Sequence, residues 1–253
     1  MKALLLDVGN SRIKWGVLEA GAIRRTGHIS RVRIGEQGLA ALTSRLPRRV
    51  DTVLVSNVAG TSFATRLSGV VGMHCDVDVH FARSEREACG VVNSYRQPRR
   101  LGVDRWVAMI GARAEFTAPC LIVDAGTAVT LDALDADGRH LGGQIIPGVR
   151  LMAASLASET SDIPVVQRQA SGSGGAMDMF GNTTAAAVGQ GALNAVAGAI
   201  ERALRILREQ GGDPEVVLTG GDASRILRSL DDAVHHRPHL VLQGLARTLE
   251  DRQ

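Results

Sequence analysis

One short segment occurs twice in this chain, and the repeat constrains the fold more than any other feature. Residues 4–11 read LLLDVGNS and residues 121–128 read LIVDAGTA, so each apolar run ends in Asp-x-Gly followed by a small polar residue. Each run is typical of a buried strand, and a second strand-like stretch follows each turn. A shift of 117 positions (124 minus 7) also places Gly21 on Gly138. We therefore expect two related halves, in which strand, turn, strand and turn repeat without a gap.

The residue types in the two turns suit the binding of phosphate. Glycine has no Cβ, so its backbone can approach a polyphosphate closely. Amide N–H groups can then point at phosphate oxygens, and the hydroxyl of Ser11 or Thr127 adds a donor. A carboxylate at a strand end, Asp7 or Asp124, provides the hard oxygen ligand that phosphate-bound Mg²⁺ requires. One copy alone could equally be an ordinary hairpin bend, but two copies favour a nucleotide held between two halves.

Composition excludes several classes of protein. The chain has 253 residues, of which 45% are apolar and 22% charged, as in a globular protein with a sizeable core. Aromatic residues make up only 3%, too few for the stacking platforms of a protein that binds single-stranded nucleic acid. We expect no nucleic-acid partner, and the formal net charge of +3 mildly favours small anionic ligands.

Neither the cysteines nor the N-terminal residues indicate export. Cys75, Cys89 and Cys120 form no C-x-x-C pair, and an odd number cannot complete a disulfide framework. Asp7 interrupts the apolar run that begins at Leu4, and no stretch approaches the roughly 18 apolar residues of a membrane span. We expect a cytoplasmic protein that has no membrane partner.

The spacing of apolar residues predicts alternating strands and helices. Strands are expected at residues 12–17, 53–56, 77–81 and 216–219, and residues 142–148 are expected to end a further strand. Helices are expected at residues 36–46, 62–70, 103–116, 151–157 and 184–209. Pro98 and Gly102 mark the boundary between an N-terminal half (1–101) and a C-terminal half (102–253), and residues 171–175 are expected to form a flexible loop.

Two further positions are open to more than one interpretation. A Gly-Gly turn at residues 220–221 would let a flat adenine or ribose lie against the backbone, but a simple strand-to-helix turn has the same sequence. Its place after both Asp-x-Gly segments favours the nucleotide. In the strand at 12–17, Lys14 alternates with buried positions, so it suits solvent as well as phosphate.

Two phosphate segments followed by a Gly-Gly turn resemble the superfamily of acetate and sugar kinases, heat-shock ATPases and actin. Within it, the chain resembles the type III pantothenate kinase family in nearly its whole length. The matching segments are 7–11, 93–105, 124–132, 142–148, 160–164 and 181–184. Residues 93–105 (NSYRQPRRLGVDR) are specific to this family. The resemblance implies an α/β fold of two ribonuclease H-like halves, as in actin-like ATPases, with a nucleotide cleft between them.

The resemblance also implies an activity and its residues. A member of this family would be a homodimer. It would transfer phosphate from ATP to the primary hydroxyl of pantothenate, which is the first step towards coenzyme A. Asp104 matches the proton acceptor. The pantothenate-binding segment is implied at Tyr95, Gly102, Val103, Asp104 and Arg105. The ATP contacts are implied at Asp7, Val8, Gly9, Asn10, Ser11, Arg12, Ile13, Lys14 and Thr127.

Three more assignments concern ions and the substrate. Asp7 would hold Mg²⁺, directly or through water, and Asp124 would hold a monovalent cation, K⁺ or NH₄⁺. Thr184 matches a substrate-contacting threonine by its spacing to Gly191, with the adjacent Thr183 as the alternative.

The reaction does not require Asp104 to be a strong base. Phosphoryl transfer passes through a loose transition state, so Asp104 would mainly orient the hydroxyl, and an ordinary carboxylate suffices. Without the family resemblance, Asp104-Arg105 would be interpreted as an acidic residue in the first turn of a helix beside a salt bridge.

Alternatives from other classes remain open. The chain could be a related kinase that acts on another small hydroxylated acid, or a regulatory protein like the Bvg accessory factor. The presence of Asp7, Asp104, Arg105 and Asp124 argues against a pure binding module, because a scaffold needs none of these groups. A heat-shock-type ATPase ranks last, because it would lack the pantothenate segment and is normally much longer.

Overall fold

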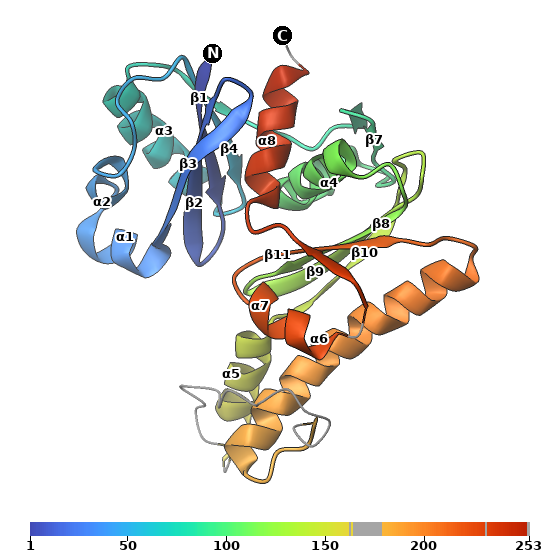
Figure 1. Ribbon diagram of the computed structural model, residues 1–253. Coiled ribbons are helices and arrows are strands. Elements are labelled where there is room, and N and C mark those ends of the chain that lie inside the picture. Colours follow the sequence, from blue (N-terminus) through green and yellow to red (C-terminus); the bar gives the residue numbers. More distant parts are fainter. Residues whose placement is uncertain (162, 164–178, 231, 252–253) are drawn as a thin grey trace. The chain divides into compact units, whose positions relative to one another are not determined.

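A computed structural model describes residues 1–161, 163, 179–230 and 232–251, and the chain forms two compact units (Figure 1). Unit 1 comprises Met1–Thr117 and His239–Gln253, and unit 2 comprises Ala118–Pro238. Each unit contains one five-stranded mixed sheet with helices packed against it. The expected α/β fold class is confirmed. The loop expected at residues 171–175 lies outside the described residues.

The units divide the chain differently from the boundary expected at residues 101 and 102. Helices α4 (Val103–Glu115) and α8 (Leu240–Glu250) both belong to unit 1, where they pack on each other and on its sheet. The segment around Pro98, which has the composition of a linker, is a short 3₁₀ helix inside the same unit, η1 (Pro98–Arg100). Local composition does not reveal that the C-terminal helix returns to the first sheet.

The sheet of unit 1 has the order β3-β2-β1-β4-β5. Its strands are β1 (Lys2–Val8), β2 (Arg12–Glu19), β3 (Ala22–Ser30), β4 (Thr52–Asn57) and β5 (Val79–Phe81). The first three form an antiparallel meander, and β4 and β5 run parallel to β1. β1 lies at the centre because both of its faces are apolar, and the side chains of residues 3–6 are fully buried.

Helices cover both faces of this first sheet. Leu4, Leu6 and Val8 pack in one core with α1 (Arg31–Gln37), α2 (Ala40–Thr43) and α3 (Thr61–Cys75). α4 and α8 cover the opposite face, and Figure 1 shows the two groups of helices on either side of the strands. A small hairpin, β6 (Glu87–Ala88) and β7 (Val91–Val92), precedes η1.

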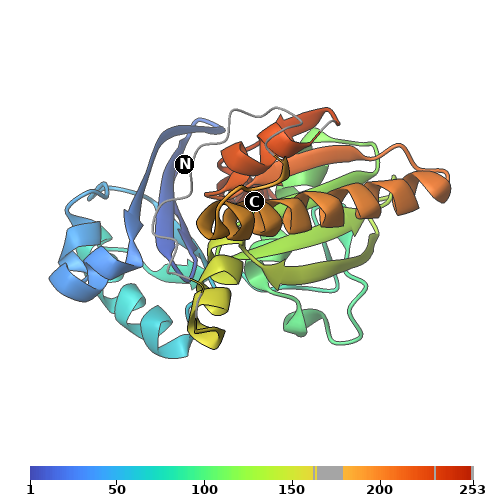
Figure 2. The same ribbon diagram turned by 90° about the horizontal axis from the view of Figure 1, so that it is seen from below.

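The sheet of unit 2 repeats the order of the first as β10-β9-β8-β11-β12. Its strands are β8 (Cys120–Ala125), β9 (Ala128–Leu134), β10 (His140–Pro147), β11 (Glu215–Thr219) and β12 (Val234–His236). Its helices are α5 (Val149–Glu159), α6 (Thr184–Glu209), α7 (Ala223–Ile226) and the 3₁₀ helix η3 (Leu227–Ser229). Figures 1 and 2 show α6 lying along one face of this sheet, with which it shares a core.

The internal repeat is confirmed, but its turns differ in length between the two copies. Gly21 and Gly138 occupy equivalent turns and have φ angles of 74° and 80°, which favour glycine. The loop between β1 and β2 spans residues 9–11, whereas the loop between β8 and β9 spans only residues 126–127. The loop between β2 and β3 spans residues 20–21, whereas the loop between β9 and β10 spans residues 135–139. The expectation of a repeat without a gap is therefore wrong in both turns.

One helix expected from the sequence is wrong, and one strand was not expected. The helix expected at 36–46 is broken into α1 and α2, because Gly38 ends α1 with a φ of 70°. β3 was not expected, since its central residues are largely exposed and lack regular apolar alternation.

The helix at 184–209 was predicted with its observed bounds. No helix in the described part of the chain is long and apolar enough to span a membrane.

Two facing glycines let α4 and α8 approach closely. A Cβ on Gly244 would collide with the carbonyl oxygen of Val107, and a Cβ on Gly111 would collide with that of Leu240. Such contacts between backbones leave no room for a methyl group.

We predict that Gly244→Ala lowers the free energy of unfolding by about 1–3 kcal/mol, because α8 must move away from α4. The matched control is Gly69→Ala in α3, where no atom lies within 4 Å of the added Cβ. This control should instead raise stability by about 0.5–1 kcal/mol, since alanine favours a helix. Urea denaturation of both variants measures the two changes, and equal effects would contradict the packing argument.

Candidate active site

Three polar side chains form a row across the first sheet. Asp7 at the end of β1 pairs with Lys14 of β2 on one side and with Ser56 of β4 on the other. Strand side chains alternate between faces, so all three share the face opposite Leu6 and Val55, which is the face of α4 and α8. Ser56 is 1% exposed, and its hydroxyl has no hydrogen-bond partner among the described residues. A carboxylate, an ammonium and a hydroxyl thus meet at the end of a buried strand.

The first glycine turn is held tightly to this row. The amide of Gly9 donates to the carbonyl oxygen of Arg12 at 3.0 Å, and the amide of Val58 donates to that of Val8 at 3.0 Å. Of the residues expected to contact ATP, Val8 and Ile13 are fully buried, so only their backbone can reach a ligand. Asn10 and Ser11 are exposed, and Arg12 and Lys14 are half-buried.

Lys14 influences His239, the residue that precedes α8. Burial lowers the pKa of His239 from its ordinary value, and the positive charge of Lys14 lowers the pKa further. The Nδ1 atom of His239 is buried and has no hydrogen-bond partner in the described structure. Lys14, which is half-buried, therefore lies close enough to His239 for its charge to affect this ring.

The start of α4 places the side chains expected to bind the acceptor. Asp104 lies in the first turn of α4, and its Oδ1 accepts the backbone N–H of Arg105 at 2.8 Å. Arg105 is only 6% exposed, and its Nη1 donates to the hydroxyl of Tyr95 at 3.0 Å. A Cβ on Gly102 would come within 2.8 Å of Asp104 Oδ1, so a side chain there would displace the carboxylate. The structure brings Tyr95, Gly102, Val103, Asp104 and Arg105 together.

Arg86 and Asn93 shape the loop that carries Tyr95. Arg86 donates to the carbonyl oxygens of Asn93 and Tyr95, both at 3.1 Å, and to that of Arg96 at 3.3 Å. The Asn93 side chain is 1% exposed, donates to the carbonyl oxygens of Glu85 and Pro98, and accepts the Tyr95 amide at 3.0 Å. These bonds replace the regular secondary structure that the loop lacks.

The second sheet carries an equivalent polar row. Asp124 at the end of β8 pairs with Thr130 of β9 and with Thr219 of β11. Thr219 is 1% exposed, and its hydroxyl has no hydrogen-bond partner among the described residues, as for Ser56 in the first sheet. Asp124 and Thr219 thus correspond to Asp7 and Ser56.

Two glycines press against the second turn. The amide of Gly148 donates to the carbonyl oxygen of Thr127 at 2.9 Å, and a Cβ on Gly148 would collide with that oxygen. Gly220 has a φ of 100°, and a Cβ there would collide with the backbone of Ala125. Asp222 follows the Gly-Gly turn, and its amide donates to the carbonyl oxygen of Ala125 at 2.9 Å. The Gly-Gly turn and the second phosphate turn are therefore one structure, with the Thr127 side chain exposed.

The two candidate threonines at the start of α6 have different roles. Thr183 is the N-cap of α6, and its side chain accepts the amide of Ala186 at 3.2 Å. Thr184 is the first residue of the helix and is exposed. Figures 1 and 2 show this start of α6 beside α5, away from the strands of the second sheet.

The two rows suit ions that are held mainly by phosphate and water. No group of three or more histidine, cysteine or acidic side chains that could bind a metal occurs within the described residues. Mg²⁺ commonly takes only one or two carboxylates and completes its shell with substrate phosphates and waters. A single carboxylate beside an unpartnered buried hydroxyl, Asp7 with Ser56, fits that requirement. Asp124 with Thr219 offers a similar set of oxygens.

Sequence reasoning missed several residues that shape these sites. Ser56 and Thr219 each end a strand beside an aspartate, and a search for the repeat in the neighbouring strands could have found them. Arg86 lies outside the family segment, and only its three carbonyl contacts reveal its role.

The fold and the glycine turns define a class of protein. Two similar mixed α/β units, each with an Asp-x-Gly turn between its first two strands, are typical of actin-like ATPases and sugar kinases. Among solved structures, a putative 2-dehydro-3-deoxygalactonokinase from Sinorhizobium meliloti is similar, with a TM-score of 0.62, 14% identity, and coverage of 98% of this chain and 96% of that chain. A putative Baf family transcriptional activator from Campylobacter jejuni also has a TM-score of 0.62, at 18% identity, with 98% of both chains covered. At these identities the similarity shows the fold alone.

The sequence comparisons identify the family within this class. A profile of the type III pantothenate kinase family matches residues 3–205. A type III pantothenate kinase from Nitrosococcus oceani is 38% identical over 258 residues, which cover 98% of this chain and 94% of the relative. The chain therefore belongs to the type III pantothenate kinase family, and it is a kinase.

We predict that Lys14→Gln raises the pKa of His239 towards its ordinary value, because one of the two causes of the shift is removed. Burial, the larger cause, remains. ¹H NMR titration of the His239 ring measures the change, with Lys2→Gln as the control, since Lys2 lies at the other end of β1. The pKa of His239 is lower in the folded state than in the unfolded state. His239 therefore contributes to the free energy of unfolding above about pH 6.5, and this contribution is lost as the pH falls through the folded-state pKa. An unchanged titration in Lys14→Gln would contradict the proximity.

We predict that Gly148→Ala weakens ATP binding about tenfold or more, because the added methyl group displaces the Thr127 turn. Calorimetric titration with ATP and Mg²⁺ measures the affinity. The control is Gly191→Ala in α6, where no atom lies within 4 Å of the new Cβ. Wild-type affinity in a folded Gly148→Ala protein would show that this turn does not contact the nucleotide.

Proposed function

We propose that this protein transfers the γ-phosphate of ATP to the primary hydroxyl of pantothenate. The product is 4'-phosphopantothenate, and the reaction is the first step of coenzyme A biosynthesis. The observation that carries the proposal is the match of residues 3–205 to the type III pantothenate kinase family. The arrangement at the start of α4 supports it, because the Asp104 carboxylate accepts the backbone N–H of Arg105 and the Arg105 side chain binds the Tyr95 hydroxyl.

The nucleotide contacts come from the two glycine turns. In the first turn, Gly9 lets the backbone approach the phosphates, backbone N–H groups of Asn10 and Ser11 are the donors, and Arg12 and Lys14 supply positive charge. In the second, the exposed hydroxyl of Thr127 donates to ATP. Mg²⁺, when bound, neutralises charge that develops on the phosphates.

Each ion has one proposed carboxylate ligand. Asp7 holds Mg²⁺ directly or through water, and the neighbouring Ser56 hydroxyl is positioned to bind a water of its shell. Asp124 holds the monovalent cation, K⁺ or NH₄⁺, beside the Thr219 hydroxyl.

Asp104 orients the hydroxyl of pantothenate and accepts its proton as the bond to phosphorus forms. Its Oδ1 already accepts the Arg105 amide, which fixes the carboxylate before the substrate arrives. Arg105 and Tyr95 bind polar groups of pantothenate, and they are held by their mutual hydrogen bond. Thr184 is the preferred threonine contact, because the Thr183 side chain is already used to cap α6.

The proposed assembly is a homodimer formed through unit 2. Several large apolar side chains of this unit are exposed, including Ile145 at 63%, Phe180 at 83% and Leu151 at 46%. Apolar side chains exposed on α5, on β10 and before α6 suit contact with a second copy. The proposed location is the cytoplasm, which suits three free cysteines. No specific observation favours a regulatory role like that of the Bvg accessory factor.

We predict that Asp104→Asn lowers pantothenate-dependent ADP release by about 10²–10⁴-fold, because the carboxylate that accepts the proton is lost. A coupled assay with Mg²⁺ measures the rate, once in potassium and once in sodium, and potassium should be required. Glu115→Gln at the far end of α4 is the matched control and should keep wild-type turnover. A folded wild-type protein that binds ATP without pantothenate-dependent turnover would overturn the proposal.

A further inference from the structure

A positively charged pocket lies beside the proposed pantothenate segment in unit 1. Its volume is about 520 Å³, and it is lined by Gly102 at the start of α4, by Asn57 at the end of β4, and by Arg83, Arg99 and Arg100. Pockets of roughly 300–1,000 Å³ are typical of small-molecule sites. None of the residues that line this pocket, all of them within the described ranges, is acidic. We call it the arginine pocket.

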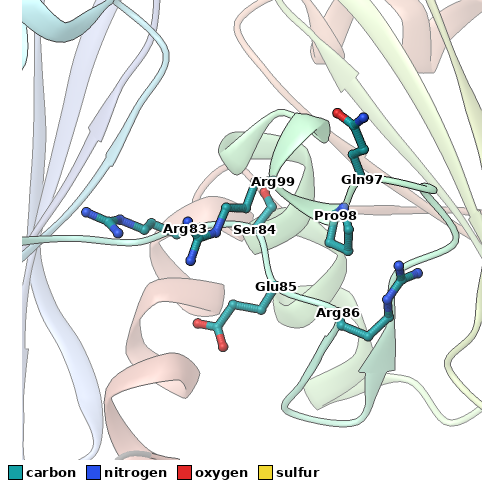
Figure 3. A pocket seen from close by; sticks show the side chains of 7 residues that line it. All are labelled: Arg83, Ser84, Glu85, Arg86, Gln97, Pro98 and Arg99. Atoms are coloured by element: carbon teal, nitrogen blue, oxygen red, sulfur yellow. The ribbon is translucent and has the colours of Figure 1, made fainter.

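Two of these arginines have no partner of their own. Neither Arg83 nor Arg99 makes a side-chain hydrogen bond or ion pair with another residue of the described chain. Both are exposed, whereas Arg86 nearby is committed to three carbonyl oxygens. Figure 3 shows the side chains of Arg83 and Arg99 extending to one side of segment 83–86 and that of Arg86 extending to the other. Two guanidinium groups are therefore available to a ligand.

The surroundings direct that ligand to the arginine pocket. Arg83 and Arg99 also line an adjoining pocket of about 570 Å³, drawn in Figure 3, but Glu85 lines that pocket as well and offsets its charge. The Ser84 side chain is buried and donates to the carbonyl oxygen of Leu101 at 2.9 Å, which ties the Arg83 segment to the start of α4. Of these two pockets, the arginine pocket beside Gly102 is therefore the one whose positive charge is not offset by an acidic residue.

The arginine pocket also borders the first phosphate turn. Asn57 lines it, and Asn57 pairs with Val8 immediately before Gly9. The amide of Val58, another lining residue, donates to the carbonyl oxygen of Val8 at 3.0 Å. A molecule in this pocket would lie next to both the proposed pantothenate segment, at Gly102 and Val103, and the first glycine turn, at Gly9.

We propose that Arg83 and Arg99 form a binding site for an anionic oxygen group of the substrate or the product. Guanidinium forks bind carboxylate and phosphate with two parallel hydrogen bonds, so either the carboxylate of pantothenate or the phosphate of 4'-phosphopantothenate has the required chemistry. The naming of these two molecules rests on the proposed function, but the anion site itself does not.

Binding measurements on the full chain test the site, with Arg83→Gln, Arg99→Gln and the double variant. The probes are inorganic phosphate, pantothenate and pantothenol, which carries an alcohol in place of the carboxylate. Each substitution should weaken binding of the recognised anion roughly tenfold, as expected for a lost charge-assisted hydrogen bond. Arg45→Gln, an exposed arginine that does not line the pocket, controls for net charge.

The outcomes separate the two sources of the anion. If the carboxylate is bound, the variants lose affinity for pantothenate and keep their affinity for pantothenol. If the phosphate is bound, they lose affinity for inorganic phosphate and inhibition by 4'-phosphopantothenate, while pantothenate binding is unchanged. Wild-type affinity of the double variant for all three probes and for the product would overturn the proposal.

The same experiment distinguishes a failure of this site from a failure of the proposed function. Arginine-dependent binding of inorganic phosphate, without ADP release on addition of pantothenate, would sink the proposed function and leave the site. Pantothenate-dependent ADP release by the double variant, with wild-type KM and product inhibition, would sink the site and leave the function.

Discussion

The parallel pairing of β1 with β4, and of β8 with β11, is the constraint on which the rest of the structure depends. Parallel neighbours end at the same edge of a sheet, so a carboxylate and a buried hydroxyl meet there in each unit. The other face of the same strands is apolar and packs against helices. Because side chains alternate along a strand, one register fixes both the core and the polar row.

Features that follow from periodicity or from backbone chemistry could be predicted from the sequence. The repeated apolar strands and their Asp-x-Gly turns gave the two similar halves, and the long alanine-rich α6 was predicted with its observed bounds. Gly38 broke a predicted helix, since apolar spacing says nothing about a local positive φ. The return of α8 to unit 1 could not be predicted, because it depends on close packing of Gly111 and Gly244, which are far apart in the sequence.

The proposed pantothenate segment is held by side chains, whereas the glycine turns are held by backbone hydrogen bonds. Residues 93–97 form no strand or helix, and the Arg86 guanidinium and the Asn93 side chain bind the backbone of this segment instead. Resemblance to a family could assign Tyr95 and Asp104, but no pattern in the sequence indicates which side chains hold them. A rigid first shell needs such support, because a displacement of about 1 Å can cost 10²-fold in rate.

As a member of this family, the protein is expected to transfer phosphate to a carbon-bound hydroxyl rather than to water. The most direct measurement is NMR of the products formed from ATP, Mg²⁺, K⁺ and pantothenate labelled with ¹³C at its hydroxymethyl carbon. We expect a new ³¹P resonance of a phosphate monoester that is coupled to the labelled carbon. Formation of ADP and inorganic phosphate alone, with the labelled carbon unchanged, would contradict it.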